Sequence, residues 1–450
     1  MLQHPYRYVD LSNMNPTELT MIRSGKEIPH ASSPAELFLS DDIFHIEDGC
    51  VSLIARVHLP RSVKSFVAVG SVALFEVCFT SEFHDPVDII VEPSRLMAAF
   101  LKCYRQSPTA SHIREACLSA FEVPLIDSKK KSMHFKIKFP DKVDRYRLYL
   151  FLHQKSPKDT AIITLPLLTD SFNVVSEHTM TLQSDVAPLL SCFRFIDGVI
   201  IEEEYGRTMG SHIYDCSVAI LRYFRMLYTL DKMSEGESCK GMRQKVAVEL
   251  GAGCGLVSIW LSKQLHAGRV IATDVSCQTP LLVRNIVVNK AQDTCTAKAL
   301  DWALFAPKNS RADITRKDES PPFDASEEST KCNVTDEKEK DANIPIVRDK
   351  FDSPPPNRFK FLKYHLGIED GEYLDMIFAG DVLYAKSLAN DFFNVIKAFA
   401  VPNETSIIVA QRLRNSDERD TFDVRSIPGL TCEVIWEEAK VVIWKIHVIP

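Results

Sequence analysis

The chain lacks several features that would place it in a well-marked class. Its twelve cysteines are dispersed and form no C-x-x-C pair, which argues against a zinc site or a disulfide scaffold. No run approaches the roughly 18 consecutive apolar residues of a membrane span, and the N-terminus has no apolar core of signal-peptide length. Basic residues are not in excess, since the net charge is −7. We therefore expect a soluble intracellular protein with no metal site and no general nucleic-acid or membrane surface.

Composition divides the 450 residues into an N-terminal and a C-terminal part. Residues 1–34 are polar and interrupted by proline, which predicts a loosely ordered lead-in. Residues 35–190 predict a strand-rich accessory domain, because apolar and polar residues alternate in several runs. Residues 199–450 carry the pattern of a second domain. Within it, residues 307–357 are rich in charge, serine and proline, which predicts a disordered insert.

The accessory region contains no motif that indicates chemistry. Phe66 to Phe79 forms a long β-rich run. After it, Leu96, Phe100 and Leu101 to Tyr104 suit an amphipathic helix that Pro93-Ser94 would open. The region contains no nucleophile elbow, zinc motif or phosphate loop, so its expected use is the choice of a partner protein.

The clearest local pattern in the chain runs from Val246 to Asp274. A short β-branched run ends at Leu250, and three glycines follow at alternate positions, Gly251, Gly253 and Gly255. Apolar residues then recur at helical spacing, and a second apolar run ends on Asp274. The order of strand, glycine turn, helix and strand is the first half of a doubly wound nucleotide-binding fold. Ligands bind such folds outside the carboxyl ends of the strands.

The glycine spacing helps to separate two classes of cofactor. A dinucleotide fingerprint needs its third glycine at position 256, where this chain has Leu256. The G-x-G-x-G spacing makes no demand for a pyrophosphate at the helix N-terminus. Glu249 would place a carboxylate beside the ligand, which suits an ammonium or sulfonium group, and Asp274 would accept hydrogen bonds from a ribose diol. The alternative is a glycine turn in another kind of α/β enzyme.

Other segments of the second domain add candidate residues. Asp301-Trp302 ends a third strand and suits an adenine, with the acid on the exocyclic amine and the ring on the base; the alternative is a tryptophan that plugs the sheet edge. The fourth strand ends in Gly380-Asp381-Val-Leu-Tyr384. Upstream, Tyr214 lies near the start of an apolar helix, where a core role and a cofactor contact are equally open. Residues 432–436 and 441–446 predict a C-terminal hairpin that closes the sheet.

These segments together resemble a known family. The block Val-Glu-Leu-Gly-Ala-Gly-Cys-Gly-Leu256 resembles motif I of class I S-adenosylmethionine methyltransferases. Asp381-x-x-Tyr384, Leu300-Asp-Trp302 and the closing hairpin are similar to the seven-β-strand protein lysine methyltransferases of the methyltransferase-like group. Where those relatives carry a tryptophan at the start of the upstream helix, this chain has Tyr214. Over residues 199–450 the resemblance implies an α/β fold, a Rossmann-like seven-stranded domain with a C-terminal β-hairpin. The strand-rich accessory domain that precedes it is expected from its own residue pattern.

The resemblance also implies a reaction and a set of site residues. S-adenosylmethionine would be the cofactor, and a lysine of a specific protein partner, a nuclear nucleic-acid-binding protein, would be the methyl acceptor. Asp381 would orient the lysine ammonium, and Tyr384 would narrow the channel; the alternatives are a loop-capping acid and a packing residue. Activity on RNA or a small molecule, or a catalytically weak adaptor, remain open. The expected cofactor-binding residues are Tyr214, Glu249, Gly251, Gly253, Gly255, Asp274, Asp301, Trp302 and Gly380.

Overall fold

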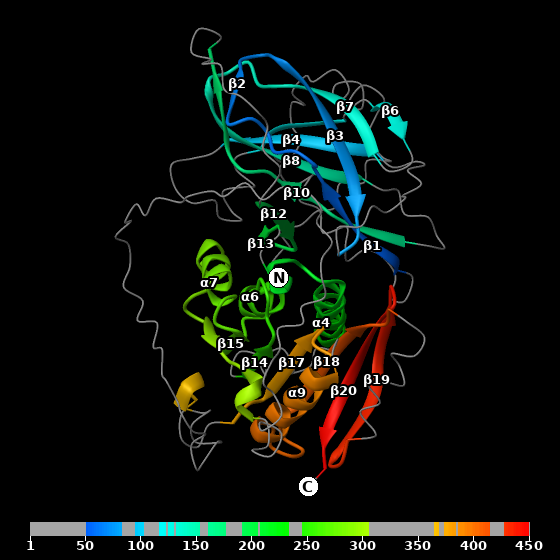
Figure 1. Cartoon of the computed structure of the whole chain (residues 1–450), viewed down its shortest axis with the longest axis vertical. Helices are drawn as coiled ribbons and strands as arrows, with labels where there is room; N and C mark the ends of the chain where they lie inside the picture. Colours follow the sequence, from blue (N-terminus) through cyan, green and yellow to red (C-terminus); the bar gives the residue numbers. More distant parts are fainter. Residues whose placement is uncertain are drawn as a thin grey trace, which may run out of the picture.

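The computed structural model describes the chain in two parts joined at a packed interface (Figure 1). The described residues are 51–82, 95–102, 117–122, 125–129, 132–153, 161–176, 191–205, 208–233, 245–305, 364–368, 373–383, 386–414 and 427–449. The predictions for the lead-in 1–34, the insert 307–357 and Tyr384 lie outside them. Within these ranges, no helix has both the length and the apolar character needed to cross a membrane.

The N-terminal part is built from strands in two sheets. These are β1 (Val51–His58), β2 (Phe66–Ala68), β3 (Val72–Thr80), β4 (Arg95–Lys102), β5 (Cys117–Glu122), β6 (Leu125–Lys129), β7 (Ser132–Lys138), β8 (Asp144–His153), β9 (Ala161–Leu165), β10 (Leu167–Leu168), β11 (Phe172–Val175), β12 (Ser191–Ile196) and β13 (Val199–Glu204). One sheet has the order β6-β7-β3-β1-β9. The other has the order β13-β12-β10-β8-β11-β2, with β4 on β8 and β5 on β4. Both sheets contribute to one aromatic-rich core, which includes Phe75, Phe135, Phe100, Tyr146 and Phe172.

The predicted helix after Pro93 is wrong. Residues 95–102 form strand β4, which pairs with β8 along its whole length, from Arg95 opposite His153 to Lys102 opposite Tyr146. Leu96 and Phe100 are both buried, and their spacing of four fits one face of a strand as well as one face of a helix. Pairing with β8 decides between the two, because it satisfies the backbone hydrogen bonds of the segment.

The C-terminal part is a seven-stranded sheet between two layers of helices. Its elements are η4 (Met209–Ser211), α4 (Asp215–Met233), β14 (Val246–Leu250), α6 (Leu256–Gln264), β15 (Arg269–Asp274), α7 (Thr279–Val288), β16 (Cys295–Ala299), η5 (Trp302–Phe305), β17 (Met376–Gly380), α9 (Lys386–Phe399), β18 (Ser406–Arg412), β19 (Leu430–Glu438) and β20 (Val441–Val448). One face of the sheet shares a core with α4, α6 and α7, and the other with α9 and η5. Every residue of β14 is buried, as expected for a central parallel strand covered on both faces.

The strand order of this sheet is β16-β15-β14-β17-β18-β20-β19. The five strands from β14 to β18 are parallel, and β20 is antiparallel to both of its neighbours, β18 and β19. The prediction of a doubly wound sheet closed by a C-terminal hairpin is therefore confirmed. The chain reverses direction across the sheet between β14 and β17, so the carboxyl ends of these strands form the topological switch point.

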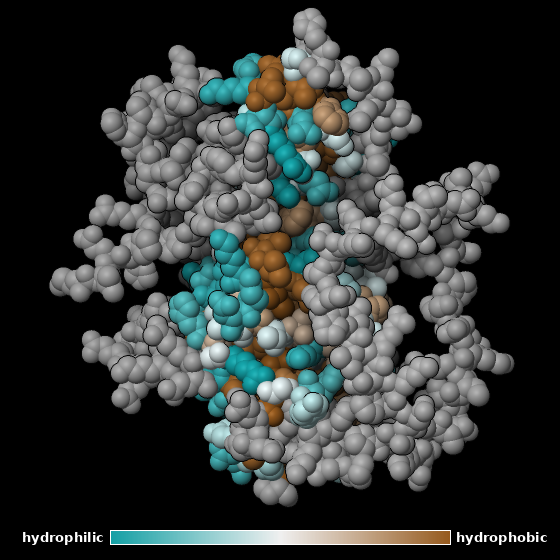
Figure 2. All heavy atoms as spheres, turned by 90° about the vertical axis from the view of Figure 1, so that its left-hand side faces the viewer, coloured by the Kyte–Doolittle hydropathy of each residue, from teal (hydrophilic) through white to brown (hydrophobic). Residues whose placement is uncertain are grey.

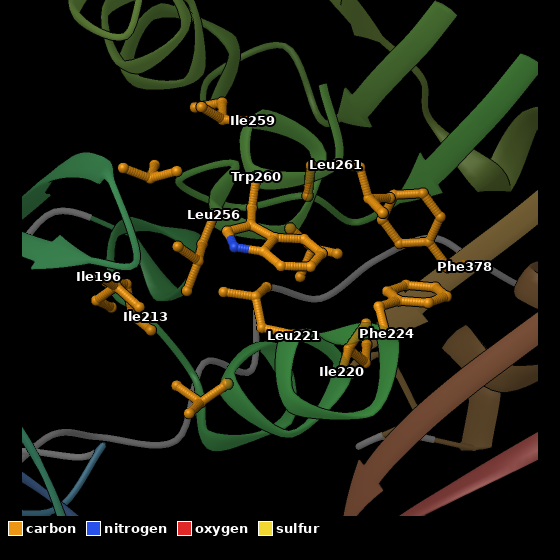
Figure 3. Close-up of a cluster of buried hydrophobic side chains, with 14 of the residues drawn as sticks. Ile196, Ile213, Ile220, Leu221, Phe224, Leu256, Ile259, Trp260, Leu261 and Phe378 are labelled. Carbon is orange, nitrogen blue, oxygen red and sulfur yellow. The ribbon is translucent and has the colours of Figure 1, made fainter. Parts of the chain in front are cut away.

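The β12–β13 hairpin joins the two parts. The indole N–H of Trp260 on α6 donates to Asp197 in the hairpin turn at 2.7 Å. Trp260 itself lies in a cluster that brings Ile196 of the hairpin together with Leu221 and Phe378 (Figure 3). Seen from the side of α7, one group of hydrophobic side chains lies near the top of the molecule and another near its middle, with hydrophilic side chains between them (Figure 2). Strand β13 begins at residue 199, the expected start of the second domain. It pairs with β12 of the N-terminal part and packs on α6 and α7 of the C-terminal part.

Asn285 of α7 and Asn289, which caps the C-terminus of that helix, bond to the outer edge of β13. Asn289 accepts from the Ile200 N–H at 2.9 Å and donates to the Ile200 carbonyl at 2.6 Å. Asn285 makes the same pair of bonds with Glu202, at 2.8 and 3.1 Å. The two amides are four residues apart and lie on the same face of the helix, so they take the place of a neighbouring strand.

Candidate active site

The glycine turn between β14 and α6 lies at the switch point, and all three glycines have positive φ. The values are 71° at Gly251, 56° at Gly253 and 85° at Gly255. Side chains avoid this left-handed region, so glycine is favoured by the backbone conformation alone.

Close packing adds a second requirement at each of these positions. A Cβ on Gly251 would lie 2.9 Å from Val382, and a Cβ on Gly253 would lie 2.9 Å from the carbonyl oxygen of Gly210. At Gly255 the nearest atom is a methyl group of Leu282 at 2.3 Å. The turn is therefore enclosed by η4, by the segment after β17 and by α7.

Asp274 connects the end of β15 to the glycine turn. Its Oδ2 accepts from the Gly253 N–H at 2.7 Å, and its Oδ1 accepts from the Val275 N–H at 2.7 Å. Burial raises the pKa of this carboxyl, and the two N–H donors act in the opposite direction. Each carboxylate oxygen can accept a second hydrogen bond. Because the side chain is only half-buried, Asp274 can still bind a polar ligand at the turn.

Glu249 bonds inside the protein at the start of α6. Its Oε2 accepts from the backbone N–H of Ser258 at 3.1 Å and from the Ser258 hydroxyl at 2.5 Å. This arrangement satisfies one of the free N–H groups in the first turn of the helix. Burial raises the pKa of Glu249 to about 8, despite the two bonds from Ser258 that favour the carboxylate. The sequence predicted that the Glu249 carboxylate lies beside a ligand. In the structure this carboxylate accepts hydrogen bonds from Ser258.

Trp302 touches the glycine turn, while the preceding Asp301 is exposed. The six-membered ring of Trp302 lies 3.4–3.5 Å from the Cβ position of Gly251, and it packs on Phe392 of α9 with ring centroids 5.3 Å apart. The indole is 9% exposed, and its Nε1 has no hydrogen-bond partner among the described residues. Asp301 accepts from the Ala303 N–H at 2.9 Å. Trp302 therefore combines a place in the core with a contact to the turn.

Tyr214 and Gly380 lie on the α4 side of the switch point. The Tyr214 hydroxyl donates to the Met209 carbonyl at 2.5 Å. Burial raises the pKa of Tyr214, and the nearby carboxylates of Asp381 and Glu82 raise it further. Gly380 ends β17, and a Cβ there would lie 3.4 Å from the Cβ of Cys216 on α4. This glycine therefore permits close packing of β17 on α4.

Asp381 follows β17 in a strained conformation and is fixed from the β18 side. Its φ of 57° is unusual for a residue with a side chain, and the residue is 8% exposed. Its N–H donates to the Ala410 carbonyl at 2.8 Å. Its Oδ1 accepts from Gln411 at 3.0 Å, and its Oδ2 accepts from Arg414. Backbone strain maintained by several neighbours is typical of functional sites.

Sequence reasoning missed the charged residues that surround Asp381. These residues are Glu82 after β3, Asp215 at the start of α4, and Arg412 and Arg414 at the end of β18. Arg412 ends the fifth strand, β18, and Arg414 comes two residues later, so their closeness to the end of the fourth strand, β17, follows from parallel pairing. Glu82 carried no comparable signal, because it comes from the N-terminal part.

Among the described residues, no group of three His, Cys, Asp or Glu side chains could hold a metal ion.

One comparison with known proteins gives a family match for part of the chain. Residues 196–314 match a family model described as lysine methyltransferase. No curated protein matches the chain at a significant level.

Several solved structures are similar to parts of the chain. TYW2 of Pyrococcus horikoshii in complex with MeSAdo is 14% identical, with 64% of this chain and 77% of that one covered and a TM-score of 0.31. The O-methyltransferase from Bacillus cereus in complex with SAH is 14% identical, with 46% and 75% covered and a TM-score of 0.27. MtNAS in complex with MTA and tNA is 15% identical, with 52% and 64% covered and a TM-score of 0.26. The chain spans less than two thirds of the length of the MtNAS structures.

The strand order, the antiparallel seventh strand and the glycine turn at the switch point occur together in the C-terminal part. The C-terminal part has the Rossmann-like, seven-stranded fold of S-adenosylmethionine-dependent methyltransferases.

Proposed function

We propose that the C-terminal part binds S-adenosylmethionine and transfers its methyl group to a lysine side chain of a protein partner. The observation that carries the proposal is the bond between Asp274 and the Gly253 N–H, which joins a carboxylate to the glycine turn at the switch point of the sheet. The match of residues 196–314 to a lysine methyltransferase family model supports lysine as the acceptor.

The residues around the turn suit the parts of this cofactor. Asp274 has remaining lone pairs for the hydroxyls of a ribose. Asp301 is an exposed acceptor shortly after β16, and Trp302 offers the edge of its six-membered ring beside Gly251. A ligand can approach the backbone of the turn closely at Gly251 and Gly253, because both residues are half-buried and neither carries a side chain. When bound, the cofactor supplies an electrophilic methyl group on a cationic sulfur.

Asp381 is the residue that we assign to the amine. A lysine has a pKa near 10.4 in water and must lose its proton before its nitrogen can attack carbon. Asp381 binds the ammonium and orients it, and a carboxylate that accepts from Gln411 and Arg414 still has lone pairs for this contact. A nearby cationic sulfur and the loss of water both favour the neutral amine. Tyr384, outside the described residues, would narrow the channel next to Asp381.

The nature of the partner is the finer part of the proposal. Ile-Phe-Ala379 and Val-Ile-Trp-Lys-Ile446 are similar to segments of methyltransferase-like protein 22. We extend the proposal to the type of substrate that this similarity implies, a nuclear nucleic-acid-binding protein, and to a nuclear or cytoplasmic site of action. The net charge of −7 favours association with a basic partner of this kind.

Methylation of a methyl-depleted cell lysate with labelled S-adenosylmethionine tests the acceptor. We expect label in a protein band, with mass spectrometry of that band showing methylated lysine. Label confined to RNA or to small molecules would contradict the lysine proposal.

Calorimetry with S-adenosylhomocysteine tests the cofactor site separately. We expect binding to the wild-type protein and a loss of about tenfold or more with Asp274→Ala, since charge-assisted hydrogen bonds contribute roughly 1.5–3 kcal/mol. A wild-type protein that shows no binding would instead favour an adaptor without catalysis.

A further inference from the structure

Six charged side chains alternate in sign between the N-terminal sheet and the end of β17. In order they are Asp381, Arg414, Glu82, Arg412, Asp215 and Arg56. Arg56 comes from β1 and Glu82 follows β3, so the N-terminal part supplies two of the six. The three carboxylates and the three guanidinium groups balance in charge. Asp381, at one end of this series, is the residue that we assign to the substrate amine.

Glu82 holds the centre of the series. Its Oε2 accepts from the Asp215 N–H at 2.9 Å, which fixes the carboxylate against the start of α4. Its Oε1 lies 2.9 Å from Nη1 of Arg412 and 3.6 Å from Nη2 of Arg414. The side chain of Glu82 is 0% exposed, so water does not screen these charges.

Arg414 links Glu82 to Asp381 through a single nitrogen. Its Nη2 donates to Asp381 and is also the atom that lies near Glu82. Arg412 and Arg414 repel each other, and the Glu82 carboxylate lies between them. Without the negative charge of Glu82 between them, the two guanidinium groups would repel each other more strongly. The side chain of Arg414 is 26% exposed and that of Arg412 is 18% exposed, so Arg414 can move into solvent more easily. Loss of Glu82 should therefore move Arg414 away from Asp381.

We infer that Glu82 is a positioning residue for methyl transfer, which holds Asp381 in place through Arg414, so that the N-terminal part completes the active site. The inference rests on the proposed role of Asp381. It assigns the accessory part a task beyond the choice of a partner, because a residue outside the methyltransferase fold sets the geometry at the end of β17.

Hydrogen exchange in the full-length protein tests the linkage without any need for activity. The segment 380–383 reports on Asp381 through two amides: the Asp381 N–H bonds to Ala410, and the Leu383 N–H bonds to the Gln411 side chain at 3.1 Å. We expect Glu82→Gln to speed exchange in this segment by about threefold or more, as coupled neighbours of this kind typically show. Arg414→Gln should do the same while it leaves intact the hydrogen bond from the Asp215 N–H to Glu82 and the ion pair between Glu82 and Arg412.

Arg225→Gln is the matched control. Arg225 on α4 pairs with Asp197 of the β12–β13 hairpin, so this substitution also removes an ion pair between the two parts. Arg225 comes ten residues after Asp215 on α4, which is about 15 Å along a helix, and Trp260 continues to hold Asp197. We expect wild-type exchange in segment 380–383 for this variant.

Activity supplies the second measurement. Glu82→Gln should lower the rate of label transfer from S-adenosylmethionine to lysate protein by about tenfold or more, with S-adenosylhomocysteine affinity within about twofold of wild type. Exchange in segment 380–383 that is unchanged in Glu82→Gln and Arg414→Gln, or changed equally in Arg225→Gln, would overturn the inference. If the exchange result holds but the wild-type protein transfers no label, the linkage stands and the proposed function fails.

Discussion

Substitution of Gly253 by alanine gives the most direct test of the glycine turn. Gly253 has a φ of 56°, and a Cβ there would lie 2.9 Å from the Gly210 carbonyl oxygen. An alanine in the left-handed region costs about 1–2 kcal/mol. Overpacking against a neighbour adds about 1–3 kcal/mol, because the carbonyl belongs to backbone and must shift as a unit. We therefore expect Gly253→Ala to destabilise the C-terminal part by roughly 2–5 kcal/mol.

Gly429→Ala separates the two contributions. Gly429 has a φ of 82°, and nothing lies within 4 Å of its Cβ position. This variant should show only the conformational cost of about 1–2 kcal/mol. The difference between the two variants then measures the close approach of Gly210 to the turn.

Thermal unfolding and calorimetry measure the two effects. A loss of 1 kcal/mol lowers the midpoint by about 2–4 °C for a domain of this size. S-adenosylhomocysteine should bind Gly429→Ala like the wild type and should bind Gly253→Ala about tenfold or more weakly, because the turn and Gly210 must separate. Equal midpoints for the two variants would refute the close packing, and full affinity of Gly253→Ala would refute the turn as the cofactor site.

Three further predictions concern other parts of the C-terminal domain. Asp381→Asn should keep S-adenosylhomocysteine binding but lower the rate of methyl transfer about 100-fold, because the substrate amine would no longer be held in line with the methyl group. Unchanged turnover would remove Asp381 from the mechanism. Glu249 has a pKa raised from 4.5 to about 8, so its contribution to stability is complete below pH 4.5 and is lost as pH rises through 8. The thermal midpoint of Glu249→Gln should therefore change less than that of the wild type between pH 6 and pH 9, and at pH 9 it should be the higher of the two. Parallel pH profiles of the midpoint for the two proteins would contradict this. Ala439 and Lys440 turn the β19–β20 hairpin with φ of 49° and 65°, so Lys440→Gly should stabilise the protein by about 1 kcal/mol, seen as a higher midpoint; a lower midpoint would argue against this turn.

The agreement between sequence and structure is best where a pattern is local. From Val246 to Asp274, buried strands, positive-φ glycines and a helix follow each other within one unit, and each has its own signal in the sequence. The helix over Lys386–Phe399 and the closing hairpin were predictable for the same reason. The β4 segment was not, since a spacing of four residues fits a helix and a strand equally and the partner strand β8 lies about 50 residues away.

The candidate site divides in the same way. The sequence alone placed Asp274 and Asp381 at the ends of parallel strands, because carboxyl ends of such strands meet at one edge of a sheet. The sequence could not predict the hydrogen bond from the Ser258 hydroxyl to Glu249, because this bond depends on where α6 begins relative to β14.

By itself, the sequence determined the succession of strands and helices in the C-terminal part, the glycine turn, and the acids at the ends of β15 and β17, because these depend on patterns within a few residues. Only the tertiary structure decided that Glu82, 299 positions before Asp381, shares Arg414 with it. The physical reason is that buried charges must find opposite charges nearby, and the nearest ones come from whichever segments the fold brings together.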